Sequence, residues 1–177
     1  MRCAIEAKFK IFNMINAIAA ISETKRALGK DQELLWKLPG DLKRLKELTW
    51  GHPLIMGRKT LTEHMNGRVL DGRTSIVISR DKDFTHPGVI VVNSIEEALE
   101  AAKKAPGSEE VFIFGGAQIY ALALPHTQRL YLTVVHDEPA ADAFFPDYSE
   151  FTKVIQKEEN VTPEGLHYDY VTLERPS

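Results

Sequence analysis

Short apolar segments alternate with segments of helical character along most of this chain, and this alternation constrains the fold more than any other feature. The apolar segments cover residues 15–21, 53–56, 75–79, 89–92 and 111–114. Their length is that of buried strands rather than of helices. Because strands that alternate with helices form a sheet covered by those helices, the chain predicts an α/β fold with a mainly parallel sheet.

Helices are expected between these strands, at residues 39–49, 58–65, 94–106 and 115–124. The third has the clearest start, because Ser94 can cap it and Glu97 follows three residues later.

The rest of the chain predicts strands at one end and a loop at the other. Residues 129–136 predict a longer strand, while residues 151–157 and 167–174 alternate in polarity and predict an antiparallel pair at one edge of the sheet. Residues 22–36 are polar without sustained periodicity and predict a long loop, of a length that is often functional.

Length and composition narrow the class of protein. The 177 residues suit one domain, which we expect to cover residues 14–177, and residues 1–13 lack a signal-peptide core and predict a dispensable extension. A net charge of −3 gives no general attraction for nucleic acid or membranes, and no apolar run approaches the roughly 20 residues of a membrane helix. One cysteine and six histidines without paired spacing predict a cytoplasmic protein with neither a disulfide nor a metal.

One carboxylate, Asp41, shares a predicted helix face with Leu38, Leu42 and Leu45. Pro39 is expected in the first turn of that helix, where its missing N–H costs nothing. Because an isolated buried charge is expensive, Asp41 predicts a partner such as a cationic or amidine-like ligand. The alternative is that Asp41 is solvated and only complements the helix dipole.

Three segments that follow predicted strands could hold phosphate groups. Residues 57–60 (Gly-Arg-Lys-Thr) combine a helix start with two cations and a hydroxyl. Residues 79–80 (Ser-Arg) add another hydroxyl next to another cation. Residues 115–116 (Gly-Gly) would let the backbone approach a ligand closely. Solvated basic turns and a tight turn are the alternatives. The chain lacks the G-x-G-x-x-G fingerprint and a G-x-S-x-G nucleophile elbow, so neither a standard dinucleotide fold nor a hydrolase triad is supported.

Together these motifs resemble the dihydrofolate reductase family, of the bacterial chromosomal type, over about residues 14–175. The segments that carry the resemblance are Ile18-Ala19-Ala20, Trp36-x-Leu38-Pro39-x-Asp41-Leu42, Ile55-Met56-Gly57-Arg58-Lys59-Thr60, Gly72-Arg73, Gly115-Gly116-x-x-x-Tyr120, Leu130-Tyr131-Leu132-Thr133 and Phe144-Phe145-Pro146. The resemblance implies an eight-stranded, mostly parallel sheet flanked by four helices. It also implies a cytoplasmic monomer of one-carbon metabolism that reduces 7,8-dihydrofolate to tetrahydrofolate with NADPH and binds antifolate inhibitors.

The resemblance also assigns roles at the reaction centre. Asp41 would bind the 2-amino group and N3 of the pterin, with Thr133 supporting it. Trp36 and Tyr120 would complete the centre, and Arg73 would pair with the α-carboxylate of the glutamate tail. Hydride would pass to pterin C6, while a water beside the loop of residues 23–36 would protonate N5. The residues expected at the substrate are Ile18, Ala19, Leu34, Leu42, Leu45, Leu70, Arg73 and Phe114.

The family pattern places the cofactor along the predicted phosphate segments. Ala20 and Leu28 would touch the nicotinamide carboxamide, and cations around a 2′-phosphate would favour NADPH over NADH. The two glycines at 115–116 match a cis peptide of the family. The residues expected at the cofactor are Ala20, Leu28, Gly57, Arg58, Lys59, Thr60, Ser79, Arg80, Gly115, Gly116, Ala117, Gln118 and Ile119.

Two other functions remain open from the sequence. One is an NADPH-dependent pyrimidine reductase of riboflavin synthesis, which shares the fold, although the Trp36-to-Asp41 motif argues for a pterin site. The other is a non-catalytic module that binds folate or a nucleotide.

Overall fold

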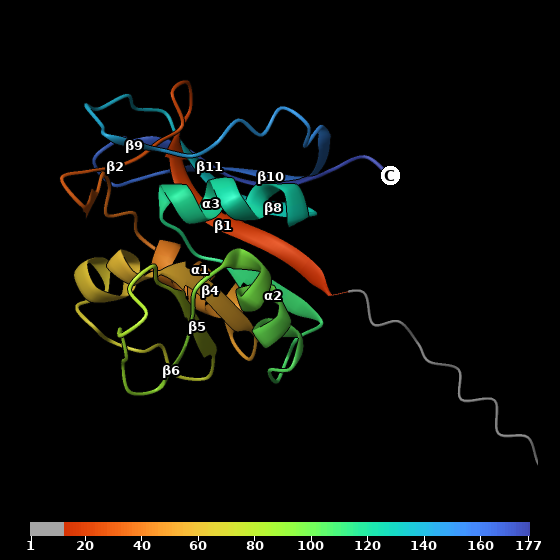
Figure 1. Ribbon diagram of the computed structural model, residues 1–177. Coiled ribbons are helices and arrows are strands. Elements are labelled where there is room, and N and C mark those ends of the chain that lie inside the picture. The colour runs from red at the N-terminus through yellow and green to blue at the C-terminus, as the bar shows by residue number, and fades with distance from the viewer. Residues whose placement is uncertain (1–12) are drawn as a thin grey trace, which may run out of the picture.

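The main sheet has eight strands in the order β10-β11-β8-β1-β7-β4-β5-β6 (Figure 1). This computed structural model describes residues 13–177, so nearly all of the predicted N-terminal extension lies outside the described residues. The strands of the main sheet are β1 (Met14–Ser22), β4 (Pro53–Gly57), β5 (Thr74–Ile78), β6 (Val89–Val92), β7 (Glu110–Ile113), β8 (Arg129–Val135), β10 (Lys153–Val161) and β11 (His167–Glu174).

Strand directions confirm the predicted sheet, which is mainly parallel with antiparallel strands at one edge. All neighbouring pairs from β8 to β6 are parallel, whereas β11 runs antiparallel to both β8 and β10. In the β4–β5 pair, Gly57 lies opposite Ile78. Therefore the two basic segments that follow these strands emerge at the same carboxyl edge of the sheet, as expected.

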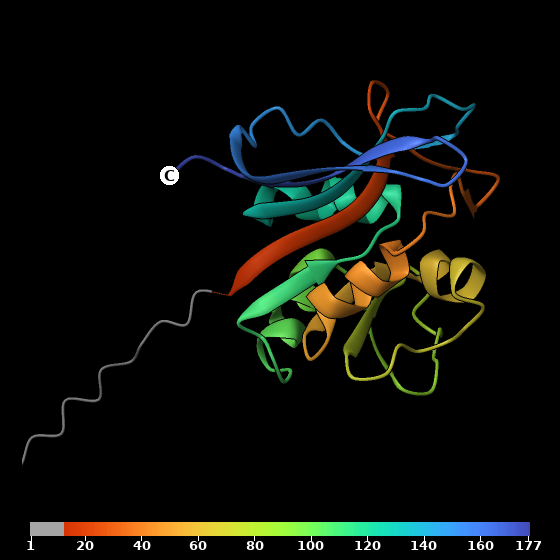
Figure 2. The same cartoon turned by 180° about the vertical axis from the view of Figure 1, so that it is seen from behind.

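Helical segments cover both faces of the sheet. In Figure 1, α2 (Ile95–Lys103) and α3 (Ala117–Ala123) lie in front of the sheet, and Figure 2 shows α1 (Asp41–Thr49) on the opposite face. A π-helical turn, η1 (Thr60–His64), makes the fourth helical segment, and a short 3₁₀ turn, η2 (Leu124–His126), follows α3. No helix within residues 13–177 is long and apolar enough to cross a membrane.

Two hydrophobic clusters hold these layers together. One lies with α2 and α3 and contains Ala19, Ile21 and Ile113, whereas the other lies with α1 and η1 and contains Ile18, Leu54 and Phe112. Successive strand residues point to opposite faces, so β1 supplies both clusters. This burial on both sides explains why its sequence is nearly continuous in apolar residues.

The clearest local differences from the sequence expectation lie at three places. The expected loop at residues 22–36 contains β2 (Ala27–Lys30) and β3 (Glu33–Leu34), which form a small sheet with β9 (Ala143–Phe144). Helix α1 begins at Asp41 rather than Pro39, because Gly40 has a φ of 80°, outside the helical region. Strand β6 was expected to be buried but lies at the sheet edge, where Ile90 is 43% exposed.

The predicted capping of α2 is present in a modified form. The Glu97 N–H donates to Ser94 Oγ over 3.1 Å, as predicted for a cap. In return, the Glu97 carboxylate accepts from the N–H of Asn93 over 2.8 Å, one residue before the cap. The cap fixes the start of α2 at the edge of the sheet where β6 ends.

Candidate active site

A cavity of about 590 Å³ opens at the carboxyl edge of the sheet. Its walls come from the ends of β4, β5 and β7, from β1 and α3, and from the small sheet. Open α/β sheets bind ligands at this edge, and the volume suits a sizeable organic ligand. Every residue that the sequence placed at the cofactor lines this cavity, and so do Leu34, Phe114 and Tyr120.

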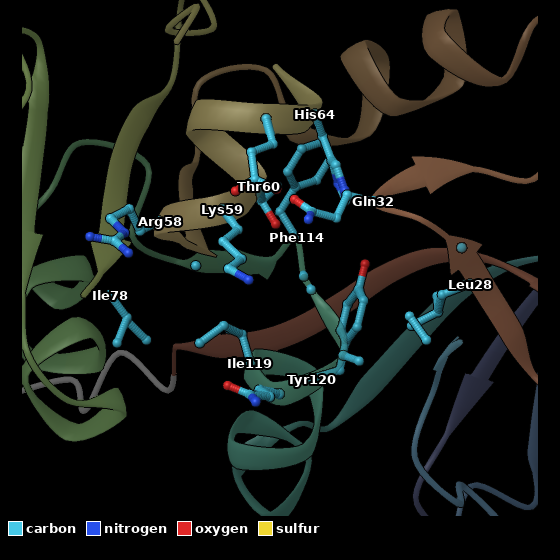
Figure 3. A pocket seen from close by; sticks show the side chains of 18 of the residues that line it. Leu28, Gln32, Arg58, Lys59, Thr60, His64, Ile78, Phe114, Ile119 and Tyr120 are labelled. Atoms are coloured by element: carbon cyan, nitrogen blue, oxygen red, sulfur yellow. The ribbon is translucent and has the colours of Figure 1, made fainter. Parts of the chain in front are cut away.

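One end of the cavity is cationic (Figure 3). Arg58 and Lys59 follow β4, and Arg80 follows β5. Arg58 Nη1 lies 3.2 Å from the Asp81 carboxylate, in an exposed ion pair that holds the guanidinium at the rim. Thr60 is buried and lines the same cavity, so a hydroxyl and several cations face one space. This arrangement is suited to a phosphate group.

The middle of the cavity is formed by bare backbone. The peptide bond between Gly115 and Gly116 is cis, and the Gly57 N–H donates to the Gly115 carbonyl over 2.8 Å. Gly115 has a φ of 103°, and a Cβ there would lie 3.0 Å from the Tyr120 ring. A Cβ on Gly57 would lie 3.1 Å from the Ile119 side chain. The conformation of Gly115 favours glycine, whereas a side chain at Gly57 would require Ile119 to shift; with glycine at both positions, a ligand can come close to the main chain.

The other end of the cavity is apolar, with Ala20 and Leu28 in its wall (Figure 3 labels Leu28). Tyr120 is buried there, and its hydroxyl donates to the Ile18 carbonyl over 2.6 Å. Burial raises the pKa of Tyr120 well above its usual value, so its hydroxyl remains protonated at neutral pH. Leu34 lies at the rim and is 70% exposed.

Asp41 lies beside this apolar end. The buried hydroxyl of Thr133 donates to Asp41 Oδ1 over 2.8 Å, which is the contact expected from the resemblance. Thr133 lies opposite Ala20 in the β1–β8 register, and Ala20 lines the cavity. The carboxylate is half-buried and fixed in orientation at one oxygen, which argues against a role limited to the helix dipole.

The predicted substrate residues divide between two environments. Leu45, Leu70 and Phe114 pack against the cluster that contains Ile18, on the α1 side of the sheet. Ala19 does not join them, because its side chain lies in the cluster with α2 and α3, and it can present only its backbone to the α1 side. Leu42 is 78% exposed next to Asp41, so an apolar surface is left open beside the carboxylate.

Arg73 is held by the end of α1. Its Nε donates to the Asp71 carbonyl over 2.9 Å, and its Nη1 donates to the Thr49 hydroxyl over 3.3 Å. Among the described residues it forms no ion pair with a carboxylate. Partial burial lowers the pKa of Arg73, and the nearby Asp71 opposes this shift. The guanidinium is therefore oriented and without an anionic partner.

Trp36 lies outside the cavity lining and fixes the segment that precedes α1. Its indole Nε1 donates over 3.0 Å to Asp137, two residues after the end of β8. Asp142 binds the same loop, because its carboxylate accepts from the Asp31 N–H over 2.9 Å and its own N–H donates to the Gly29 carbonyl over 3.1 Å. These contacts connect the loop of residues 23–36 to residues 137–142.

Several cavity residues were missed by the sequence analysis. Asn93 and Ser94 line the cationic end, and their position could have been inferred, since a capped helix follows a strand at this edge. Gln32, His64 and Asp142 also line the cavity, but no local pattern marks them. Within residues 13–177, no group of three or more His, Cys, Asp or Glu side chains could hold a metal ion.

A parallel sheet with a cavity at its carboxyl edge, cationic at one end and apolar near a fixed carboxylate at the other, defines an α/β nucleotide-binding protein. Comparison with known proteins identifies the family within this class. The family model for dihydrofolate reductase matches residues 14–175. The chain therefore belongs to the dihydrofolate reductase family.

Individual relatives agree with this assignment. The chain is 39% identical to dihydrofolate reductase of Bacillus subtilis (strain 168) over 161 residues, which cover 90% of this chain and 92% of that protein. It is 38% identical to the Staphylococcus haemolyticus enzyme, with 90% and 93% covered. A solved structure of the Enterococcus faecalis enzyme, complexed with NADP(H) and RAB-propyl, superposes with a TM-score of 0.83 at 34% identity, covering 93% of this chain and 98% of that one.

Proposed function

We propose that this protein reduces 7,8-dihydrofolate to 5,6,7,8-tetrahydrofolate with NADPH, and so supplies reduced folate for one-carbon metabolism. The observation that carries the proposal is the Asp41 carboxylate, bound by Thr133 beside the apolar end of a cavity whose far end is cationic. Family membership supports the same reaction.

The residues around the cavity fit NADPH. Arg58, Lys59 and Arg80 would surround the 2′-phosphate, which gives NADPH an advantage over NADH because NADH lacks this group. Gly115 and Gly116 line the middle of the cavity, and residues 117–119 at the start of α3 would face the pyrophosphate. The nicotinamide would then lie at the apolar end of the cavity.

Asp41 would recognise the pterin through its charge and geometry. A carboxylate can accept two N–H groups at once, so the pterin 2-amino group and N3 match its two oxygens. Protonation of N5 places positive charge on the pterin as it accepts hydride at C6, and a fixed carboxylate stabilises that charge. Leu45, Leu70 and Phe114 would form the apolar walls of the substrate site.

Bound NADPH would supply the hydride that reaches pterin C6. In the family pattern Asp41 contacts the opposite side of the pterin from N5, so we infer that a water delivers the proton to N5. The loop of residues 23–36 would admit that water, close over the reacting rings and exclude bulk solvent. The contacts of Asp137 and Asp142 would hold the loop in its closed position.

The deciding experiment offers NADPH together with either dihydrofolate or a ribosylaminopyrimidine and follows the loss of reduced-nicotinamide absorbance. Rapid loss with dihydrofolate alone is the expected result. Turnover of the pyrimidine instead would assign the protein to riboflavin synthesis. Tight binding of folate and NADPH without turnover would make it a binding module.

We further propose a cytoplasmic monomer that binds antifolate inhibitors, with one catalytic domain at residues 14–177. Deletion of residues 1–13 should leave turnover and melting temperature unchanged, and light scattering should give the mass of one chain. Lost activity after deletion would show that the extension contributes to the domain.

A further inference from the structure

Two cations lie over a single exposed indole at the end of α1. Trp50 is 52% exposed, and its ring centroid lies 5.2 Å from Lys46 Nζ and 5.6 Å from Arg73 Cζ. Within residues 13–177, neither cation has a carboxylate within ion-pair distance. An aromatic face attracts a cation at these distances without neutralising it. The Trp50 ring therefore contacts two cations, and both remain available to bind an external anion.

The position of this ring is set by the backbone beside Arg73. Gly72 has a φ of 71°, and a Cβ there would lie 2.6 Å from the six-membered ring of Trp50. The Gly51 N–H donates to the Gly72 carbonyl over 2.7 Å and joins the two segments. Glycine thus lets the indole rest directly against the residue that precedes Arg73.

The contacts of Arg73 leave one side of its guanidinium open. The bonds to the Asp71 carbonyl and the Thr49 hydroxyl use Nε and Nη1, and no described residue accepts from Nη2. Trp50 supplies the third contact. The three together fix the plane of the guanidinium, and a fixed plane favours two-point binding of a carboxylate.

We propose that Trp50 is a positioning residue for the anionic end of the substrate. It holds Arg73, with Lys46 nearby, in the orientation that binds the carboxylates of the glutamate tail, and it does not touch the reacting rings. The inference rests on the proposed function. It predicts that Trp50 affects affinity for substrates with an anionic tail, and leaves turnover of bound substrate unchanged.

The test compares dihydrofolate with dihydropteroate, which lacks the glutamate, in Trp50→Leu, Trp50→Gln and Trp50→Phe. From the usual strength of an exposed cation–π contact, the two ring-free variants should raise KM for dihydrofolate about fivefold. Their kcat should stay within about twofold, and KM for dihydropteroate should not change. Trp50→Phe should recover most of the affinity, since it restores an aromatic face.

The control is Val154→Ala, which removes apolar surface from an exposed position on β10. It should leave both substrates unaffected. Equal KM changes for both substrates in the ring-free variants, or a Phe variant as weak as the Leu variant, would overturn the inference and assign Trp50 a structural role. If the wild type reduces neither substrate, the proposed function fails, and equilibrium binding of folate and pteroate to the same variants then decides the role of Trp50.

Discussion

Replacing Thr133 with valine should impair the reaction without disturbing the fold. The change removes the hydroxyl that donates to Asp41 over 2.8 Å and keeps the size and branching of the side chain. Thr133 is 2% exposed in the middle of β8, a place where valine is a favourable strand residue. The variant therefore isolates one hydrogen bond.

The size of the effect follows from the charge on the acceptor. A hydrogen bond to a charged group contributes roughly 1.5–3 kcal/mol, and about 1.4 kcal/mol corresponds to a tenfold change in rate. Because Asp41 is only half-buried, water can replace part of the lost bond. We therefore expect the lower end of the range, a loss of about tenfold in kcat/KM.

Steady-state turnover of dihydrofolate and equilibrium binding of NADPH should be measured in parallel. NADPH affinity should not change, because the predicted phosphate and backbone contacts lie elsewhere. Thr172→Val provides a matched control, since Thr172 is another buried threonine on the neighbouring strand β11. Wild-type kcat/KM in Thr133→Val, or an equal loss in Thr172→Val, would refute the idea that the hydroxyl orients Asp41.

Two further predictions concern charge. Arg58→Gln should weaken NADPH by about tenfold, as expected for one lost charge-assisted hydrogen bond, and barely affect NADH; equal weakening in a fluorescence titration would place the 2′-phosphate elsewhere. Hydrogen bonds from Arg129, opposed by burial and aided by Lys153, lower the pKa of Glu174 from its ordinary 4.5. Its bridge should therefore stabilise the fold above about pH 4.5 and lose that effect as the pH falls through the lowered pKa. Glu174→Gln should lower the free energy of unfolding by up to about 1 kcal/mol at pH 7, and by less toward pH 3, as measured by denaturant unfolding. A loss that does not depend on pH would show that the bridge of Glu174 is not its cause.

Much of the sheet could be predicted because its signals are local. Apolar runs of strand length marked β1, β4, β5 and β7, and Ser94 marked the start of α2. The positions of the phosphate-like segments followed from parallel strands, which bring successive carboxyl ends to one edge.

The remainder depends on contacts between distant segments. Strand β2 is short, and its partner β9 is more than a hundred residues away, so no periodicity marks the small sheet. The contact of Trp36 with Asp137 likewise joins residues 101 positions apart. The start of α1 was misplaced by two residues, because Pro39 suggested a first turn while the backbone reverses at Gly40.

The sequence indicated which residue types belong to the site, but it did not indicate the contacts that hold them in place. The sequence identified Asp41 as an unusual acid, yet its bond to Thr133 joins residues 92 positions apart. Likewise, no sequence pattern marks Trp50, because its proposed role depends on the positions of Lys46 and Arg73 around its ring.

The most direct test of the central claim compares wild-type protein with Asp41→Asn, mixed with NADPH and dihydrofolate, while reduced-nicotinamide absorbance is followed. Absorbance should fall rapidly with the wild type and little with the variant at neutral pH. The variant should still bind NADPH, and should recover part of its turnover at low pH, where the substrate arrives already protonated. Near-wild-type turnover of Asp41→Asn at neutral pH would contradict the account.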